Sequence, residues 1–158
     1  MIVTQLGAGS IIEELRRRGQ SLAVAESITG GGLGAAITSM PGSSEVFSGG
    51  VIAYQLSIKT DLLHVPQPLI EKFGVVSEEV AVAMADGVRA LFNTTWAIAT
   101  TGVAGPGAAD GVEAGTVWIA IRGPINQGTQ LDIQGEREVV RNATVSSAIT
   151  AFARILAS

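Results

Sequence analysis

The sequence has 158 residues, of which 47% are apolar and only 15% charged, and its formal net charge is −4. This composition predicts a single domain over residues 1–158 with a substantial core. The acidic balance argues against nucleic-acid binding, which requires a basic face. The absence of cysteine excludes disulfides, cysteine nucleophiles and thiolate metal sites, and a single histidine, His64, argues against a histidine-rich metal centre.

The N-terminal segment gives no indication of targeting. Residues 1–9 lack both the basic start and the long apolar stretch of a signal peptide. No apolar run reaches the roughly 18 to 20 residues that a membrane-spanning helix needs. We therefore expect a cytoplasmic domain without a membrane partner.

In the first half of the chain, helical and extended patterns alternate. Apolar spacing predicts a helix over residues 11–18, and a buried strand follows over 21–26. A glycine-rich turn over 27–34 leads into a helix over 33–40, which stops at a Pro-Gly pair. A second strand is expected over 46–54, and short helical pieces over 55–63 and 68–73.

The second half adds a long helix, three strands and a closing helix. Ser77 is a suitable N-cap for a helix over 78–92, which carries acidic residues in its first turn. Strands are expected over 96–101, 115–121 and 129–133, with a loop over 102–114 and a last helix over 136–156. This order favours an α/β fold, namely a three-layer α/β/α arrangement with a mixed, mostly parallel sheet of about five or six strands.

The turn after the first predicted strand is a candidate site. Ser27 ends that strand and is followed by Thr29, Gly30 and Gly31. Ligands of open α/β sheets bind at the carboxyl edge of the strands. The glycines allow a close approach of the backbone, and the first helical N–H groups are suited to an oxyanion or a phosphate. Ser27 is thus a candidate nucleophile, and a serine that only caps the next helix is the alternative.

A serine nucleophile requires a base. His64 lies between apolar residues in L-L-H-V-P, so we interpret it as a packed or surface residue. Lys59 is the other candidate, with Tyr54 five residues before it, and both come near Ser27 if the first two strands are neighbours. A working lysine base must be neutral, so its pKa must be lowered from about 10.4 by burial or by a nearby cation. A solvated lysine and a tyrosine at the core edge are the alternative.

Two further features are candidates for ligand binding. The run from Thr100 to Pro106, at the end of the third strand, has the composition of a loop that cradles a ligand, but it matches no ATP or dinucleotide motif. Arg137 and Arg141 are four residues apart and share a helix face. They are candidates to receive a phosphate, or else to pair with neighbouring glutamates on the surface.

Seven motifs occur in a fixed order along the chain. They are A-E-S-I-T-G-G at 25–31, P-G-S-S at 41–44, G-G-V-I-A-Y at 49–54 with Lys59, G-V-V-S at 74–77, T-G-V-A-G-P at 101–106, G-T-V-W at 115–118 and G-E-R-E-V-V-R at 135–141. In this order the sequence closely resembles the CinA C-terminal domain family, which includes bacterial nicotinamide-mononucleotide deamidases. The resemblance extends over residues 11–156.

The resemblance implies hydrolysis of the carboxamide of nicotinamide mononucleotide to nicotinate mononucleotide and ammonia, a step in pyridine-nucleotide recycling. It implies a serine–lysine mechanism without a metal or other cofactor, in which Ser27 is the nucleophile, Lys59 the base and Tyr54 an assisting hydroxyl. The substrate, a small nucleotide, would contact residues from three segments: Thr29, Gly30 and Gly31; Thr101, Gly102, Ala104 and Gly105; Arg137 and Arg141. Larger members of the family carry a further N-terminal domain, so this sequence looks like a stand-alone form.

Three positions depart from the family pattern. Leu56 replaces a usual asparagine, and Val112 and Glu113 replace a usual Lys-Pro pair. The loss of a lysine and the gain of an acid near a phosphate site would weaken or redirect binding. The alternative function is therefore a catalytically degenerate module of the same family that binds a nucleotide or a protein partner without turnover. The high apolar content of so small a domain is compatible with a homodimer.

Overall fold

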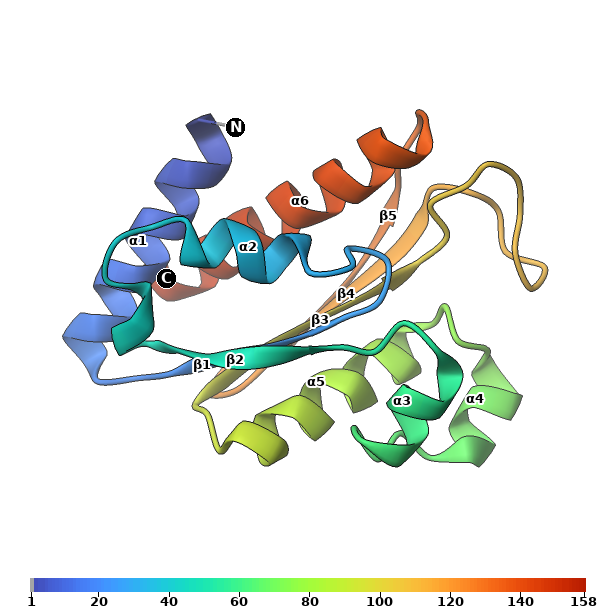
Figure 1. The fold of residues 1–158 in the computed structure, drawn as a ribbon, viewed down its shortest axis with the longest axis horizontal. Coiled ribbons are helices and arrows are strands. Elements are labelled where there is room, and N and C mark those ends of the chain that lie inside the picture. The colour runs from blue at the N-terminus through green and yellow to red at the C-terminus, as the bar shows by residue number, and fades with distance from the viewer. Residues whose placement is uncertain (1) are drawn as a thin grey trace.

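Strand-forming segments rich in small and branched apolar residues build the centre of the molecule. The computed structural model describes residues 2–158, with side chains from residue 7 onward. Within this range one sheet has the order β2-β1-β3-β4-β5 (Figure 1). Its strands are β1 (Leu22–Glu26), β2 (Phe47–Ile52), β3 (Trp96–Gly102), β4 (Thr116–Arg122) and β5 (Gln127–Asp132).

The direction of the strands makes the sheet mixed. β1 pairs in parallel with both β2 and β3, whereas β4 is antiparallel to both β3 and β5. Four strands therefore run in one direction and β4 opposes them. The first two strands are neighbours, which is the condition under which Tyr54 and Lys59 come near Ser27. The predicted mixed, mostly parallel sheet is confirmed.

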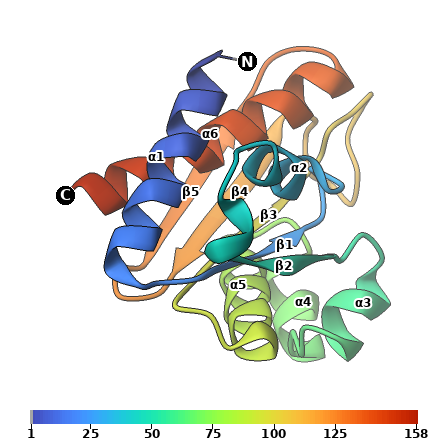
Figure 2. The ribbon, with the colours of Figure 1, turned by 60° about the vertical axis from the view of Figure 1, so that its left-hand side comes forward.

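Helices cover both faces of the sheet, as the two views show (Figures 1 and 2). One face carries α1 (Ile2–Arg18), α2 (Gly32–Thr38) and α6 (Arg137–Ala157). The other face carries α3 (Leu56–Asp61), α4 (Gln67–Phe73) and α5 (Glu78–Phe92), and a 3-10 turn, Ser43–Glu45, precedes β2. The predicted three-layer α/β/α arrangement is confirmed.

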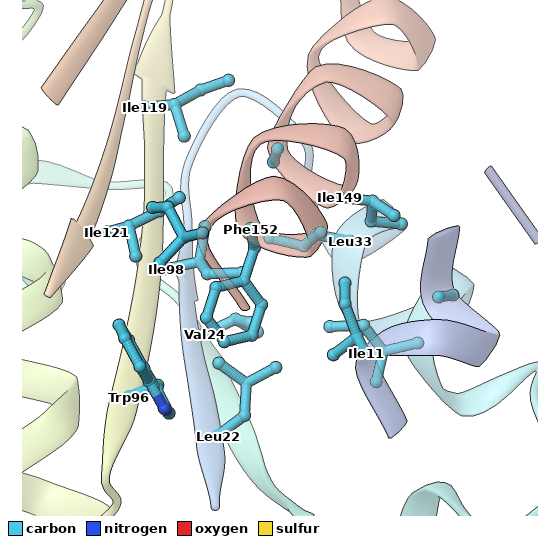
Figure 3. Close-up of a cluster of buried hydrophobic side chains, with 14 of the residues drawn as sticks. Ile11, Leu22, Val24, Leu33, Trp96, Ile98, Ile119, Ile121, Ile149 and Phe152 are labelled. Atoms are coloured by element: carbon cyan, nitrogen blue, oxygen red, sulfur yellow. The ribbon is translucent and has the colours of Figure 1, made fainter. Parts of the chain in front are cut away.

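The alternation of side chains along β1 divides the core between these two layers. All five residues of β1 are buried. Leu22 and Val24 belong to the apolar cluster under α1 and α6, whereas Ala23 and Ala25 belong to the cluster under α5, as the two-residue period of a strand requires. Figure 3 shows the first cluster. In it the rings of Trp96 and Phe152 pack edge to face, with their centroids 5.2 Å apart.

The predicted start of the first helix at residue 11 is wrong, because α1 begins at Ile2. Each glycine disfavours a helix by about 1 kcal/mol relative to alanine. Because Gly7 and Gly9 precede residue 11, the helix was predicted to begin only after them. At Gly7, a Cβ atom would lie 2.9 Å from Cγ2 of Ile149 in α6. The absence of a side chain is thus what lets α1 approach α6, and this packing outweighs the low helix propensity.

The remaining boundaries shift by small amounts. β2 ends at Ile52, so Ala53 and Tyr54 belong to the connection to α3 and not to the strand. The predicted N-cap of α5 is confirmed, since the Ser77 hydroxyl accepts a hydrogen bond from the Val80 N–H at 3.2 Å. None of the helices in the described part of the chain combines the length and apolar character needed to cross a membrane.

Candidate active site

Three parallel strands deliver the candidate residues to one edge of the sheet. Ser27 directly follows β1, Lys59 lies in α3 after β2, and β3 runs into the loop at 103–115. A cavity of about 330 Å³ opens at this edge. Of the residues predicted from the sequence, those that line it are Ser27, Tyr54, Lys59, Thr101, Gly102, Ala104, Gly105 and Arg137.

The hydroxyl of Ser27 and the amine of Lys59 are in direct contact. Nζ of Lys59 donates to Oγ of Ser27 at 3.0 Å, and also to the carbonyl oxygens of Ala53 at 2.5 Å and Tyr54 at 3.3 Å. Lys59 is only 1% exposed, and none of the ion pairs among the described residues includes it. Burial lowers the pKa of Lys59 from 10.5 to about 8.

A buried carboxylate closes the N-terminus of α2. Glu26, which is 2% exposed, accepts hydrogen bonds from the backbone N–H groups of Gly31 at 3.2 Å, Leu33 at 2.8 Å and Gly34 at 3.0 Å. The expectation that these N–H groups receive an oxyanion or a phosphate is therefore wrong. Sequence reasoning missed Glu26, although an acid placed directly before a glycine-rich helix start is a recognisable signal.

Arg141, which does not line the cavity, holds the turn that follows Ser27. Its Nε donates to the carbonyl oxygen of Ile28 and its Nη2 to that of Thr29, each at 3.1 Å. The Thr29 hydroxyl is buried against that of Thr100 at 2.8 Å. Four predicted binding residues of this region, Thr29, Gly30, Gly31 and Arg141, do not line the cavity. They shape the turn that carries Ser27.

Arg137 reaches across the cavity mouth. Its Nη1 donates to the Gly105 carbonyl oxygen at 2.6 Å, and its Nη2 to the Tyr54 hydroxyl at 3.1 Å. Among the described residues, no ion pair joins this arginine to Glu136 or Glu138, which was the alternative pairing. The Tyr54 hydroxyl makes no hydrogen bond to Ser27 or Lys59 in the described structure, where only its backbone carbonyl contacts the lysine.

The loop between β3 and β4 is more regular than its composition predicted. The Thr101 hydroxyl donates to the Val75 carbonyl oxygen at 3.1 Å. Farther on, Ala109 and Val112 pair as a two-residue hairpin around Asp110 and Gly111. Both turn residues have positive φ, 51° and 75°, which an Asp-Gly pair accommodates well. This hairpin places Asp110 at the cavity wall.

The three departures from the family pattern lie away from the cavity wall. Leu56, at the start of α3, is 41% exposed, and Glu113 is also exposed. Val112 pairs with Ala109 in the hairpin. None of the three lines the cavity that holds Ser27 and Lys59.

His64 is remote from the serine in the assembled site. It is exposed, has a left-handed backbone with φ 57°, and borders a different hollow formed with Asp86 and Leu91. A serine–histidine pair is therefore not formed. Within residues 2–158, no group of three or more acidic or histidine side chains is arranged to hold a metal ion.

Comparison with known proteins identifies the family. The model of the CinA C-terminal domain matches residues 5–156. The chain belongs to the CinA C-terminal domain family. A CinA-like protein of Parasynechococcus marenigrum is 46% identical over 153 residues, which are 94% of this chain and 36% of that protein. A CinA-like protein of Synechocystis is 46% identical over 151 residues, again 36% of its length. This CinA-family chain thus spans about a third of these curated relatives.

Two solved structures share the fold over nearly all of their length. The competence damage-inducible protein A of Klebsiella pneumoniae is 32% identical, with a TM-score of 0.93 over 98% of this chain and 97% of that one. The competence/damage inducible protein CihA of Agrobacterium tumefaciens is 30% identical, with a TM-score of 0.93 over 99% and 96%.

Proposed function

We propose that this CinA-family domain is an amidohydrolase that converts nicotinamide mononucleotide to nicotinate mononucleotide and ammonia, with Ser27 as nucleophile and Lys59 as general base. The observation that carries the proposal is the 3.0 Å contact between Oγ of Ser27 and Nζ of a fully buried lysine, at the wall of a cavity large enough for a small ligand. A nucleophile paired with a base of lowered pKa is the arrangement that acyl transfer requires.

In the first half-reaction, neutral Lys59 accepts the proton of Ser27 while Oγ attacks the carboxamide carbon. The resulting ammonium group then donates a proton to the leaving nitrogen, and ammonia departs from an acyl-serine. In the second half-reaction, Lys59 accepts a proton from a water molecule that attacks the acyl carbon. The bond to Oγ breaks, the proton returns to Ser27, and the acid is released.

The burial of Lys59 makes this base available near neutral pH. A lysine with a pKa of 10.5 would need about 5 kcal/mol to lose its proton at pH 7, since each pKa unit corresponds to about 1.4 kcal/mol. With a pKa of about 8, the cost falls to roughly 1.4 kcal/mol. About one molecule in ten is then already in the reactive form at pH 7.

Backbone donors are available for the oxygen of the reacting carbonyl. The N–H groups of Ile28 and Ala104 belong to residues of the cavity wall and have no acceptor in the described chain. An N–H immediately after the nucleophile and a second one from a facing loop supply the kind of pair that stabilises a tetrahedral oxyanion. Arg137 provides the positive charge at the same cavity for a phosphate.

The test is release of ammonia from nicotinamide mononucleotide by the purified protein. Ser27→Ala should lower turnover by a factor of about a thousand or more, and Lys59→Ala nearly as much. The double variant should be little worse than either single one, because the two residues act as a unit.

His64→Ala is the control and should keep full activity, since this residue lies outside the cavity. If wild-type protein is stabilised by the mononucleotide but releases no ammonia, the chain is the binding module of the alternative function and the proposed reaction is wrong.

A further inference from the structure

Tyr54 accepts two hydrogen bonds at the cavity, one through its backbone and one through its side chain. Its backbone carbonyl accepts from Nζ of Lys59, whereas its hydroxyl, at the end of a side chain that is 59% exposed, accepts from Nη2 of Arg137. The hydroxyl therefore contacts the arginine and neither member of the serine–lysine pair. This arrangement separates the main-chain role of residue 54 from the role of its side chain.

The Arg137 guanidinium is held in place but not neutralised. It is fixed on one side by the Gly105 carbonyl and on the other by the Tyr54 hydroxyl, both uncharged acceptors. None of the ion pairs found among the described residues includes Arg137, although Asp110 lines the same cavity. A guanidinium has five N–H donors, and only two are used here, so three remain for a ligand.

We propose that Tyr54 and the Gly105 carbonyl hold Arg137 as a preformed anion subsite, and that the Tyr54 hydroxyl acts in recognition of an anionic substrate tail and not in proton transfer at Ser27. Tyr54 is thus a positioning residue for Arg137. The inference rests on the proposed function for the identity of the reaction, but the anion subsite is a property that binding alone can test. A guanidinium fixed before binding loses less conformational freedom when the anion arrives.

Steady-state kinetics with two substrates tests this assignment. Nicotinamide mononucleotide carries the phosphate, and nicotinamide riboside lacks it. Tyr54→Phe should raise KM for the mononucleotide by roughly three- to tenfold, the worth of one hydrogen bond, with kcat unchanged. The riboside kinetics should stay the same. Arg137→Gln should raise KM for the mononucleotide by about tenfold or more, and adding Tyr54→Phe to it should change nothing further.

Arg141→Gln is the matched comparison from the same helix. Because Arg141 holds the carbonyl groups of the turn after Ser27 and does not line the cavity, this variant should lower kcat for both substrates alike. If Tyr54→Phe behaves in the same way, with equal loss of kcat on mononucleotide and riboside, its hydroxyl takes part in the chemistry and the inference is wrong.

A binding measurement keeps the inference separate from the proposed reaction. Calorimetric titration of the Ser27→Ala protein with ribose 5-phosphate should show binding that is weakened by Tyr54→Phe and more strongly by Arg137→Gln. If ribose 5-phosphate does not bind the Ser27→Ala protein, the anion subsite does not exist. Equal affinity for the Ser27→Ala protein with and without Tyr54→Phe or Arg137→Gln would also overturn the inference. Failure of wild-type protein to hydrolyse any pyridine nucleotide would overturn only the proposed reaction.

Discussion

At the scale of single residues, the burial of Lys59 sets the pH at which the proposed mechanism can operate. The amine has three oxygen acceptors and no carboxylate partner, so burial is the cause of its lowered pKa. A neighbouring acid would have raised that pKa and kept the base protonated. The burial of Lys59 thus lowers its pKa toward neutral pH. In the proposed mechanism, the protonation state of Lys59 should therefore control the activity.

The expected pH dependence of the proposed reaction follows from this pKa. Lys59 must be neutral to accept the serine proton, so kcat/KM should rise about tenfold per pH unit below pH 8 and level off above it. The riboside is the better substrate for this measurement, because the second ionisation of a phosphate near pH 6 adds its own effect. A profile that is flat between pH 6 and 9 would show that Lys59 is not the base.

Local motifs in the sequence indicated candidate residues, but not what each of them contacts. Ser27 and Lys59 were expected to come near each other only if the first two strands are neighbours; these strands do pair, and Nζ of Lys59 lies 3.0 Å from Oγ of Ser27. The partner of the Tyr54 hydroxyl was not predictable, because Arg137 lies 83 residues away and approaches only once α6 is docked. Arg141 was a candidate either to receive a phosphate or to pair with neighbouring glutamates. Helical spacing places it on the same face as Arg137 but does not reveal what that face contacts, which is the backbone of Ile28 and Thr29.

At the scale of elements, the short helix α2 depends on a residue of the preceding strand. Its left-handed N-cap, Gly31, provides no side chain, and the Glu26 carboxylate supplies the missing acceptors for three backbone N–H groups. A buried charge is tolerated here because its hydrogen bonds replace those of water. The same contact fixes the turn in which Ser27 stands.

Glu26→Gln should therefore destabilise the protein. The amide offers one acceptor oxygen in place of two and turns a buried N–H₂ group toward backbone donors, so the loss should be roughly 1 to 3 kcal/mol in urea unfolding. Glu45→Gln is the control, because Glu45 is 58% exposed and its ion pair with Arg16 should contribute no more than about 1 kcal/mol. Equal losses in the two variants would show that Glu26 does not anchor α2.

The elements themselves were largely predictable, because their hydrophobic periods and caps are local. The N-terminal half of α1 was not predictable, because Gly7 lowers the local helix propensity. The reason for this glycine, the close packing against Ile149 of α6, is visible only in the folded structure. The hairpin at Asp110 was also missed, although Asp-Gly is a strong turn signal, because the glycine-rich composition of the whole segment concealed it.

At the scale of the whole molecule, the buried Lys59 reduces the stability of the fold at neutral pH. Its pKa is about 8 when folded and 10.5 when exposed, so below pH 8 both states are protonated and folding carries the full cost of burying the charge. Between pH 8 and 10.5 the unfolded chain binds more protons, and stability rises with pH. The pH-dependent part amounts to roughly 3 kcal/mol at about 1.4 kcal/mol per pKa unit.

Comparison with Lys59→Met isolates this contribution. The variant lacks the titrating group, so the difference in unfolding free energy between the two proteins should change in favour of wild type as the pH rises from 8 to 10.5. A constant offset is expected as well, because methionine leaves the carbonyl oxygens of Ala53 and Tyr54 without their donor. Parallel stability curves over this pH range would contradict a lowered pKa for Lys59.

The position of Arg137 at the first residue of α6 has a consequence for how such domains diverge. The first buried residue of that helix is Val140, so position 137 carries no core side chain and is exposed. A change there leaves the packing of α6 and the serine–lysine pair intact. In the proposed function, selectivity for the charged end of a substrate can therefore change through a single substitution at position 137, without any change to the contact between Ser27 and Lys59.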